Sequence, residues 1–129
     1  MIGSWKYFKP EEMKCKCGQC GSTGNEMDSG FMAKLDQLRE KMKIPLVITS
    51  GYRCPEYNAK VSGTGKSGPH TTGKAADIAI DRMKAYHLLD YAMQLGFTGI
   101  GIDQKGNGRF IHLDTLTSEE SFRPCVWSY

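Results

Sequence analysis

Residues 67–80 read Ser-Gly-Pro-His-Thr-Thr-Gly-Lys-Ala-Ala-Asp-Ile-Ala-Ile, and this stretch joins a polar loop to an apolar strand. Four glycines and a proline within residues 62–74 predict a loop. The small and apolar residues of 75–80 predict a strand. The loop carries His70 and the strand carries Asp77, so two side chains of metal-ligating type lie near the junction.

The chain on either side of this junction predicts further regular elements. Apolar residues repeat at a period near 3.6 within 29–43 and again within 82–95, which is typical of helices packed on a core. The run at 46–49 is β-branched and apolar, so it is expected to form a buried strand. A short helix is expected over 55–61, and a hairpin over strands 98–102 and 109–114. This order predicts an α+β domain: a small, mainly antiparallel sheet with flanking helices.

The bulk properties fit one soluble domain. The chain has 129 residues, of which 24% are charged, so we expect a single domain over 1–129 that begins with a cysteine-containing segment, 1–27. No block of Lys and Arg predicts nucleic-acid binding, and no apolar run reaches the roughly 20 residues that span a membrane. The first residues show no secretory signal pattern, so synthesis in the cytoplasm is expected. A monomer is also expected.

His70, Asp77 and His112 form a plausible metal-binding set. A catalytic zinc site uses three nitrogen or oxygen ligands from the protein and keeps one open position for water. His112 lies in the predicted strand 109–114, where side chains at i and i+2 share a face. Asp114 therefore faces the same side as His112, either as a general base or as the partner that orients His112. His87 lies in a predicted helix without a second ligand at suitable spacing, and is interpreted as structural.

Three motifs resemble the M15 peptidases. They are Ser50-Gly51-Tyr52-Arg53, then the H-x-x-G-x-A-x-D pattern from His70 to Asp77, then Phe110-Ile111-His112-Leu113-Asp114. The M15 peptidases include zinc D-alanyl-D-alanine carboxypeptidases and bacteriophage endolysins, and they share a fold with the hedgehog signalling domain. The resemblance implies this fold, with His70, Asp77 and His112 as zinc ligands.

The resemblance also implies roles for residues around the metal. Arg53 would contact the substrate carbonyl or carboxylate, a role that suits its planar, permanent charge; a surface ion pair is the alternative. Many members carry the catalytic acid/base three residues before the last zinc ligand, where this chain has Arg109. Asp114 is the predicted substitute, with Asp103 as the next candidate. Ser67 and Trp127 are substrate-binding candidates, and loop capping and packing on the sheet are their respective alternatives.

Five cysteines are present, and Cys15, Cys17 and Cys20 lie within six residues. A second, structural zinc would need a fourth ligand, either Cys54 or Cys125. Reduced thiols or disulfides are the alternatives.

The resemblance implies hydrolysis of an amide bond in peptidoglycan stem peptides, with zinc as the cofactor. The action would be at the bacterial cell wall, reached through holin-dependent release or as part of a virion if the chain is from a phage. Two alternatives are open: a metal-containing wall-binding module without catalysis, and a structural phage tail component. The bond itself, whether D-Ala-D-Ala, a cross-link or L-Ala-D-Glu, is not indicated by the sequence.

Overall fold

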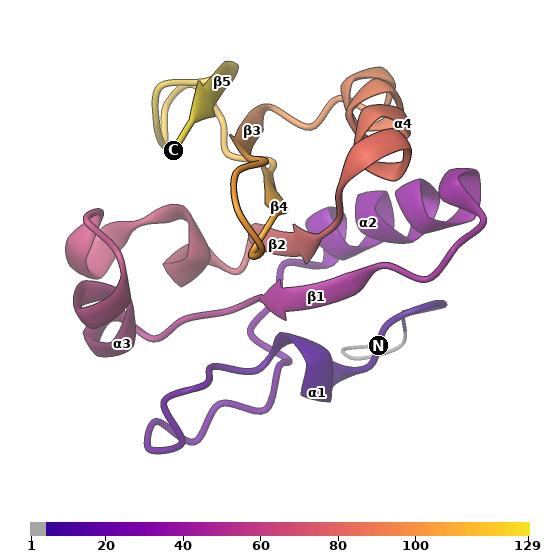
Figure 1. Cartoon of the computed structure of the whole chain (residues 1–129). Helices are drawn as coiled ribbons and strands as arrows, with labels where there is room; N and C mark the ends of the chain where they lie inside the picture. The colour runs from indigo at the N-terminus through magenta and orange to yellow at the C-terminus, as the bar shows by residue number, and fades with distance from the viewer. Residues whose placement is uncertain (1–4) are drawn as a thin grey trace.

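The computed structural model describes residues 5–129, so the first four residues of the 1–27 segment lie outside the described part. Within residues 5–129, five strands form one sheet in the order β1-β2-β4-β3-β5 (Figure 1). The strands are β1 (Val47–Ser50), β2 (Ala75–Ala79), β3 (Gly99–Asp103), β4 (Phe110–Asp114) and β5 (Cys125–Ser128). All neighbouring pairs are antiparallel except β3 and β5. The predicted α+β class and mainly antiparallel sheet are confirmed.

The two long helices are α2 (Ser29–Met42) and α4 (Arg82–Gln94), and they lie side by side (Figure 1). The carboxylate of Asp28 accepts a hydrogen bond from the Phe31 amide and begins α2. Lys43, at a left-handed φ of 59°, follows its last residue. Both helices agree with the predicted ranges to within a residue. Shorter helices are α1 (Pro10–Met13), α3 (Pro55–Val61) and the 3₁₀ turns η1 (Gly65–Ser67) and η2 (Pro69–Thr72).

The sheet has two faces of different character. In the register of β2, β4 and β3, Asp77 pairs with His112 and His112 with Gly101. Paired residues point to the same side, so one face carries the polar candidates. The alternate residues form the other face and are buried with α2 and α4 in the hydrophobic core; they include Ala76, Ile78, Ile100, Ile111 and Leu113. One sheet therefore separates the core from the candidate site.

β1 departs from expectation. It was predicted as a buried strand, but this is wrong, because it lies at one edge of the sheet and Val47 is 60% exposed. An apolar β-branched run indicates an extended strand but does not determine whether both faces are covered. Leu46, just before the strand, supplies the buried side chain instead.

The N-terminal segment and the last strand were not predicted as regular structure. Phe8 and Met13 belong to the core, and α1 places Met13 so that its carbonyl accepts a hydrogen bond from the Tyr52 amide at 2.8 Å. β5 extends the sheet by pairing in parallel with β3, which brings Trp127 beside Gly101. No helix within residues 5–129 has both the length and the apolar character needed to span a membrane.

Candidate metal centre and substrate cleft

Three buried side chains meet on the polar face of the sheet. His70 comes from η2, Asp77 from β2 and His112 from β4. Their exposed fractions are 5%, 8% and 2%, and their candidate ligand atoms all lie within 4.8 Å of one another. Asp77 Oδ1 is 3.2 Å from His70 Nε2 and 3.1 Å from His112 Nδ1. The sequence-predicted set is therefore brought together around one point.

The outer nitrogen of each histidine is held by a separate acceptor. His70 Nδ1 lies 2.7 Å from the Gly51 carbonyl oxygen, and His112 Nε2 lies 2.7 Å from Asp114 Oδ2. Each acceptor favours the tautomer that protonates the outer nitrogen and leaves a lone pair on the inner one. Metal-ligating histidines typically have this arrangement. Two inward lone pairs and a carboxylate fit the donor set of a catalytic zinc.

The charge of Asp77 also suits a ligand. Burial alone opposes ionisation, but hydrogen bonds from His112 and His70 outweigh it and hold the pKa of Asp77 well below its ordinary value. The pKa of His112 is raised despite its burial, because Asp114 and Asp77 both stabilise its protonated form. Protons and a metal therefore compete for the same inner nitrogen.

Arg53 lies at the edge of this centre, between β1 and α3. Its Nη2 is 3.5 Å from Asp77 Oδ2. Its Nε donates to Ser50 Oγ at 3.0 Å and its Nη1 donates to Asn58 Oδ1 at 3.0 Å. The guanidinium is thus held from two sides and remains partly exposed. Its only acidic partner, within residues 5–129, is the candidate ligand Asp77.

Asn58, which was not among the predicted site residues, positions the Arg53 guanidinium. It is 1% exposed on α3, and its amide nitrogen donates to Thr64 Oγ1 and to the Gly65 carbonyl. Asn58 therefore joins Arg53 to the loop that leads to His70. The available signal was an asparagine inside a short predicted helix, where this residue type is a poor helix former.

Asp114 lies on the predicted face, yet it is completely buried and does not line the cleft described below. Its Oδ2 binds His112, and Arg123 donates to both oxygens at 2.9 and 2.8 Å. Burial opposes its ionisation, but the bonds from His112 and Arg123 lower the pKa of Asp114 to about 2. Of its two predicted roles, this geometry supports orientation of His112 and argues against general base. Arg123 was not among the predicted site residues. Its contact with Asp114 forms only because the chain returns to the sheet after β4.

Two glycines of β3 make room for these side chains. A Cβ on Gly99 would lie 2.1 Å from Asp114 Oδ1, and a Cβ on Gly101 would lie 2.6 Å from Trp127 Nε1. Side chains at these two positions would therefore displace Asp114 or Trp127.

The candidate metal centre opens into a cavity of about 530 Å³, called the cleft below. Its lining residues are Arg53, Val61, Ser62, Thr64, Pro69, His70, Asp77, Asp103, Phe110, His112, Ser121, Arg123, Trp127 and Tyr129. The Trp127 ring centroid is 5.1 Å from that of His112, and the Arg123 guanidinium stacks 5.0 Å from the Trp127 ring centroid. A metal site with one aromatic wall and two arginines can bind an apolar group beside an anionic or carbonyl oxygen.

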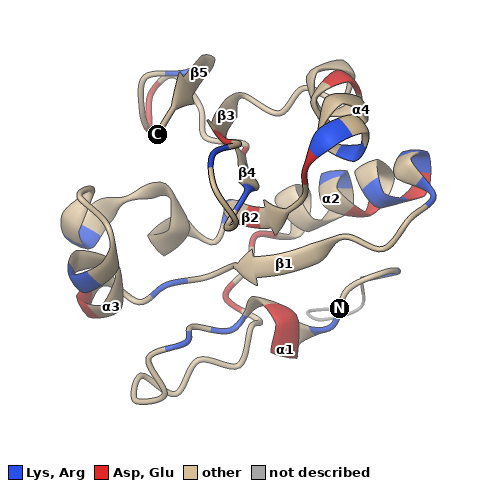
Figure 2. Cartoon of the chain, viewed as in Figure 1, with Lys and Arg blue, Asp and Glu red and all other residues tan. Residues whose placement is uncertain are grey.

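The remaining candidates fall outside the cleft. Ser67 is exposed and does not line it, so the predicted substrate contact is not supported. His87 is exposed on α4, the helix that packs against the core face of the sheet. This position is that of a surface residue. Basic and acidic positions are mixed along α2, α3 and α4 rather than gathered by sign (Figure 2). This distribution gives no support to nucleic-acid binding.

One protein-family model, Peptidase M15, matches residues 6–114. The matched span contains Arg53 and the three converging residues, and ends at Asp114. It excludes Arg123 and Trp127, which β5 and the segment before it bring to the cleft. No curated protein matches the chain.

Proposed function

The chain belongs to the peptidase M15 family, and from this premise we propose that it is a zinc-dependent peptidase that hydrolyses an amide bond in peptidoglycan stem peptides. The observation that carries the proposal is the convergence of His70, Asp77 and His112 at the floor of the cleft. The proposed place of action is the bacterial cell wall, as a phage endolysin or a D-alanyl-D-alanine carboxypeptidase.

The residues present fit a zinc ion. Two imidazole nitrogens and one carboxylate oxygen lie around one point, and both outer imidazole nitrogens are held by acceptors. When bound in such a site, zinc polarises the scissile carbonyl and lowers the pKa of a coordinated water.

Arg53 has the position and chemistry to hold the substrate. It lines the cleft beside Asp77, and its guanidinium can donate to the scissile carbonyl oxygen as negative charge develops there. The same group can bind a peptide's terminal carboxylate. Asn58 and Ser50 hold the guanidinium before substrate arrives, which reduces the ordering that binding requires.

Asp103 is the better-placed carboxylate for proton transfer. Among residues 5–129, Asp77 and Asp103 are the carboxylates that line the cleft. Asp103 follows Gly101 by two positions on the polar face of β3, about 7 Å along the strand from the row that contains His112. We assign it the transfer of a proton from the attacking water to the leaving amine, the role first considered for Asp114.

The test is digestion of purified muropeptides with product identification by mass. The intact protein should release chelator-sensitive products, and their masses identify the bond. His112→Ala should lose this activity, whereas His87→Ala, a change on exposed α4, should retain it. If the folded protein is zinc-loaded and gives no product, the enzyme proposal fails and a wall-binding module is favoured; retention on peptidoglycan then tests that alternative.

A further inference from the structure

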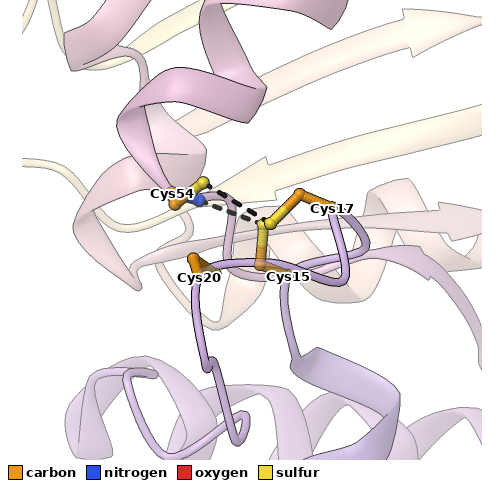
Figure 3. A group of neighbouring side chains, drawn as sticks. All are labelled: Cys15, Cys17, Cys20 and Cys54. Carbon is orange, nitrogen blue, oxygen red and sulfur yellow. Dashed lines mark hydrogen bonds between the residues drawn. The ribbon is translucent and has the colours of Figure 1, made fainter.

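A second group of metal-ligating side chains lies outside the cleft. Cys15, Cys17 and Cys20 lie in the loop after α1, and Cys54 is the residue directly before α3 (Figure 3). Their four sulfur atoms all lie within 4.8 Å of one another. Cys125 is on β5, with its sulfur near the Val126 carbonyl, and it is not part of the group.

The sulfur spacing matches a metal site. Cys54 Sγ and Cys17 Sγ are 3.8 Å apart. Tetrahedral zinc has Zn–S bonds of about 2.3 Å, which places any two sulfurs of a Cys₄ site about 3.8 Å apart. A disulfide instead needs about 2.05 Å, and all four thiols are free.

Backbone amides surround the sulfurs. Amides donate to three of them: Cys54 N to Cys15 Sγ at 3.3 Å, Gln19 N to Cys17 Sγ at 3.4 Å and Tyr57 N to Cys54 Sγ at 3.4 Å. N–H donors of this kind stabilise the charge on thiolate ligands.

The loop has the backbone geometry that such a site needs. Gly18 and Gly21 each follow a cysteine and adopt left-handed φ values of 73° and 75°. Residues with a side chain rarely adopt this backbone conformation. The two glycines therefore allow the chain to turn sharply after Cys17 and after Cys20. These turns bring three cysteines within six residues to one point.

From these observations we propose that Cys15, Cys17, Cys20 and Cys54 bind a structural zinc ion, separate from the catalytic centre. All four ligands come from the protein, so the site is closed and has no position for substrate. A zinc ion bound there would join the N-terminal segment to residues 51–54. Arg53 precedes the ligand Cys54, and the Gly51 carbonyl holds His70. The zinc would therefore support two residues of the cleft without contacting substrate.

The packing of Gly51 indicates the same link. A Cβ there would lie 2.8 Å from Met13 Cα, so the N-terminal segment lies directly against the loop. The Tyr52 amide also donates to the Met13 carbonyl at 2.8 Å. Release of the segment would remove these supports from the loop that carries Arg53.

The test uses the His70→Ala/His112→Ala double variant, which lacks two of the three proposed catalytic ligands but retains every cysteine. The protein produced with zinc should contain about two zinc ions per chain, and the double variant about one. Replacing the remaining zinc by Co²⁺ should give the intense thiolate-to-cobalt absorption of a Cys₄ site. Adding Cys125→Ser to the double variant should leave this spectrum unchanged, whereas adding Cys20→Ser should alter it.

Two results would overturn the proposal. One is a folded double variant that holds no zinc and gives no thiolate–cobalt absorption. The other is a denatured, chelator-treated protein in which these four cysteines resist alkylation until a reductant is added, which would show that they form disulfides. Neither depends on peptidase activity, so failure of the structural site and failure of the proposed function are distinguishable. Circular dichroism of each variant checks folding, and the double variant alone decides the question if Cys20→Ser does not fold.

Discussion

The two carboxylates Asp103 and Asp114 differ in what their oxygens contact. Asp114 is enclosed by His112 and Arg123, whereas Asp103 accepts a bond from the Lys105 amide and lines the cleft. A carboxylate that already binds a guanidinium and an imidazole has little basicity left. Asp114 is therefore suited to orient the candidate ligand His112, and Asp103 is suited to transfer a proton.

Exchange of each carboxylate for an amide should separate the two roles. Asp103→Asn should lower kcat by about 10²–10⁴-fold with zinc affinity unchanged, because it removes a general acid/base. Asp114→Asn should weaken zinc binding about 10–100-fold, because it removes the partner of a ligating histidine. Zinc competition with a chelator and steady-state kinetics measure the two effects. Asp90→Asn, on exposed α4, is the control, and equal zinc loss in both site variants would contradict the assignment.

Arg53 is fixed by Ser50 and Asn58 before any substrate binds. Arg53→Lys keeps the charge but loses the planar fork, so kcat/KM should fall by about 10²-fold or more while zinc content is retained. Hydrolysis of a defined muropeptide measures the change. A loss below about threefold would show that Arg53 serves only as an ion pair with Asp77.

At the scale of elements, β3 carries glycines at two positions that neighbouring side chains approach closely. Gly99→Ala should destabilise the protein by about 1–3 kcal/mol, because its Cβ overlaps Asp114 and overpacking has this cost. Gly108→Ala is the matched control in the β3–β4 turn, since nothing lies within 4 Å of its Cβ. Denaturant unfolding compares the two variants. Equal stability of both would mean that Asp114 can move aside.

The loop that carries the cysteines is closed by Glu26, whose carboxylate accepts from Ser22 and from the Gly24 amide. Burial opposes ionisation and raises the pKa of Glu26, but the combined hydrogen bonds from its own amide, Ser22, Gly24 and Thr23 outweigh burial, so the pKa is lowered overall. A lowered folded-state pKa adds stability above the unfolded value near 4.3 and loses it as pH falls through the folded value.

Glu26→Gln should therefore be less stable than the parent chain at pH 6, by under about 1 kcal/mol because the group is largely exposed. The difference should close as the pH falls below about 4. Denaturant unfolding at pH 6 and at lower pH measures it. A difference that grew in acid would contradict the assigned contacts.

At the scale of the whole molecule, residues 51–54 would connect two metal sites, because the Gly51 carbonyl holds His70 and Cys54 belongs to the cysteine group. Removal of zinc should lower the melting temperature, because a ligand at 100 times its Kd stabilises the folded state by about 2.7 kcal/mol. The chelator effect should persist in the His70→Ala/His112→Ala variant, where the cysteine site remains. Thermal unfolding with and without chelator measures this, and an unchanged melting temperature in that variant would contradict a structural zinc.

Local patterns in the sequence predicted the long helices, the hairpin of β3 and β4, and the three side chains that converge as candidate ligands. Helical periodicity over 29–43 and the short apolar runs around Asp77 and His112 are local patterns, and these local patterns persist in the fold. The motifs around Arg53 and His70 indicated the family for the same reason.

The contacts of these residues depend on how distant parts of the chain pack together. Asp114 and Asp103 share a face of the sheet, and the chain segment that returns with Arg123 and β5 decides which is enclosed. Cys54 rather than Cys125 joins the cysteine cluster because α3 begins beside the N-terminal loop. Exposure of β1 depends on strand order in the sheet. Each outcome depends on residues far apart in the chain, whose approach is set by packing rather than by local propensity.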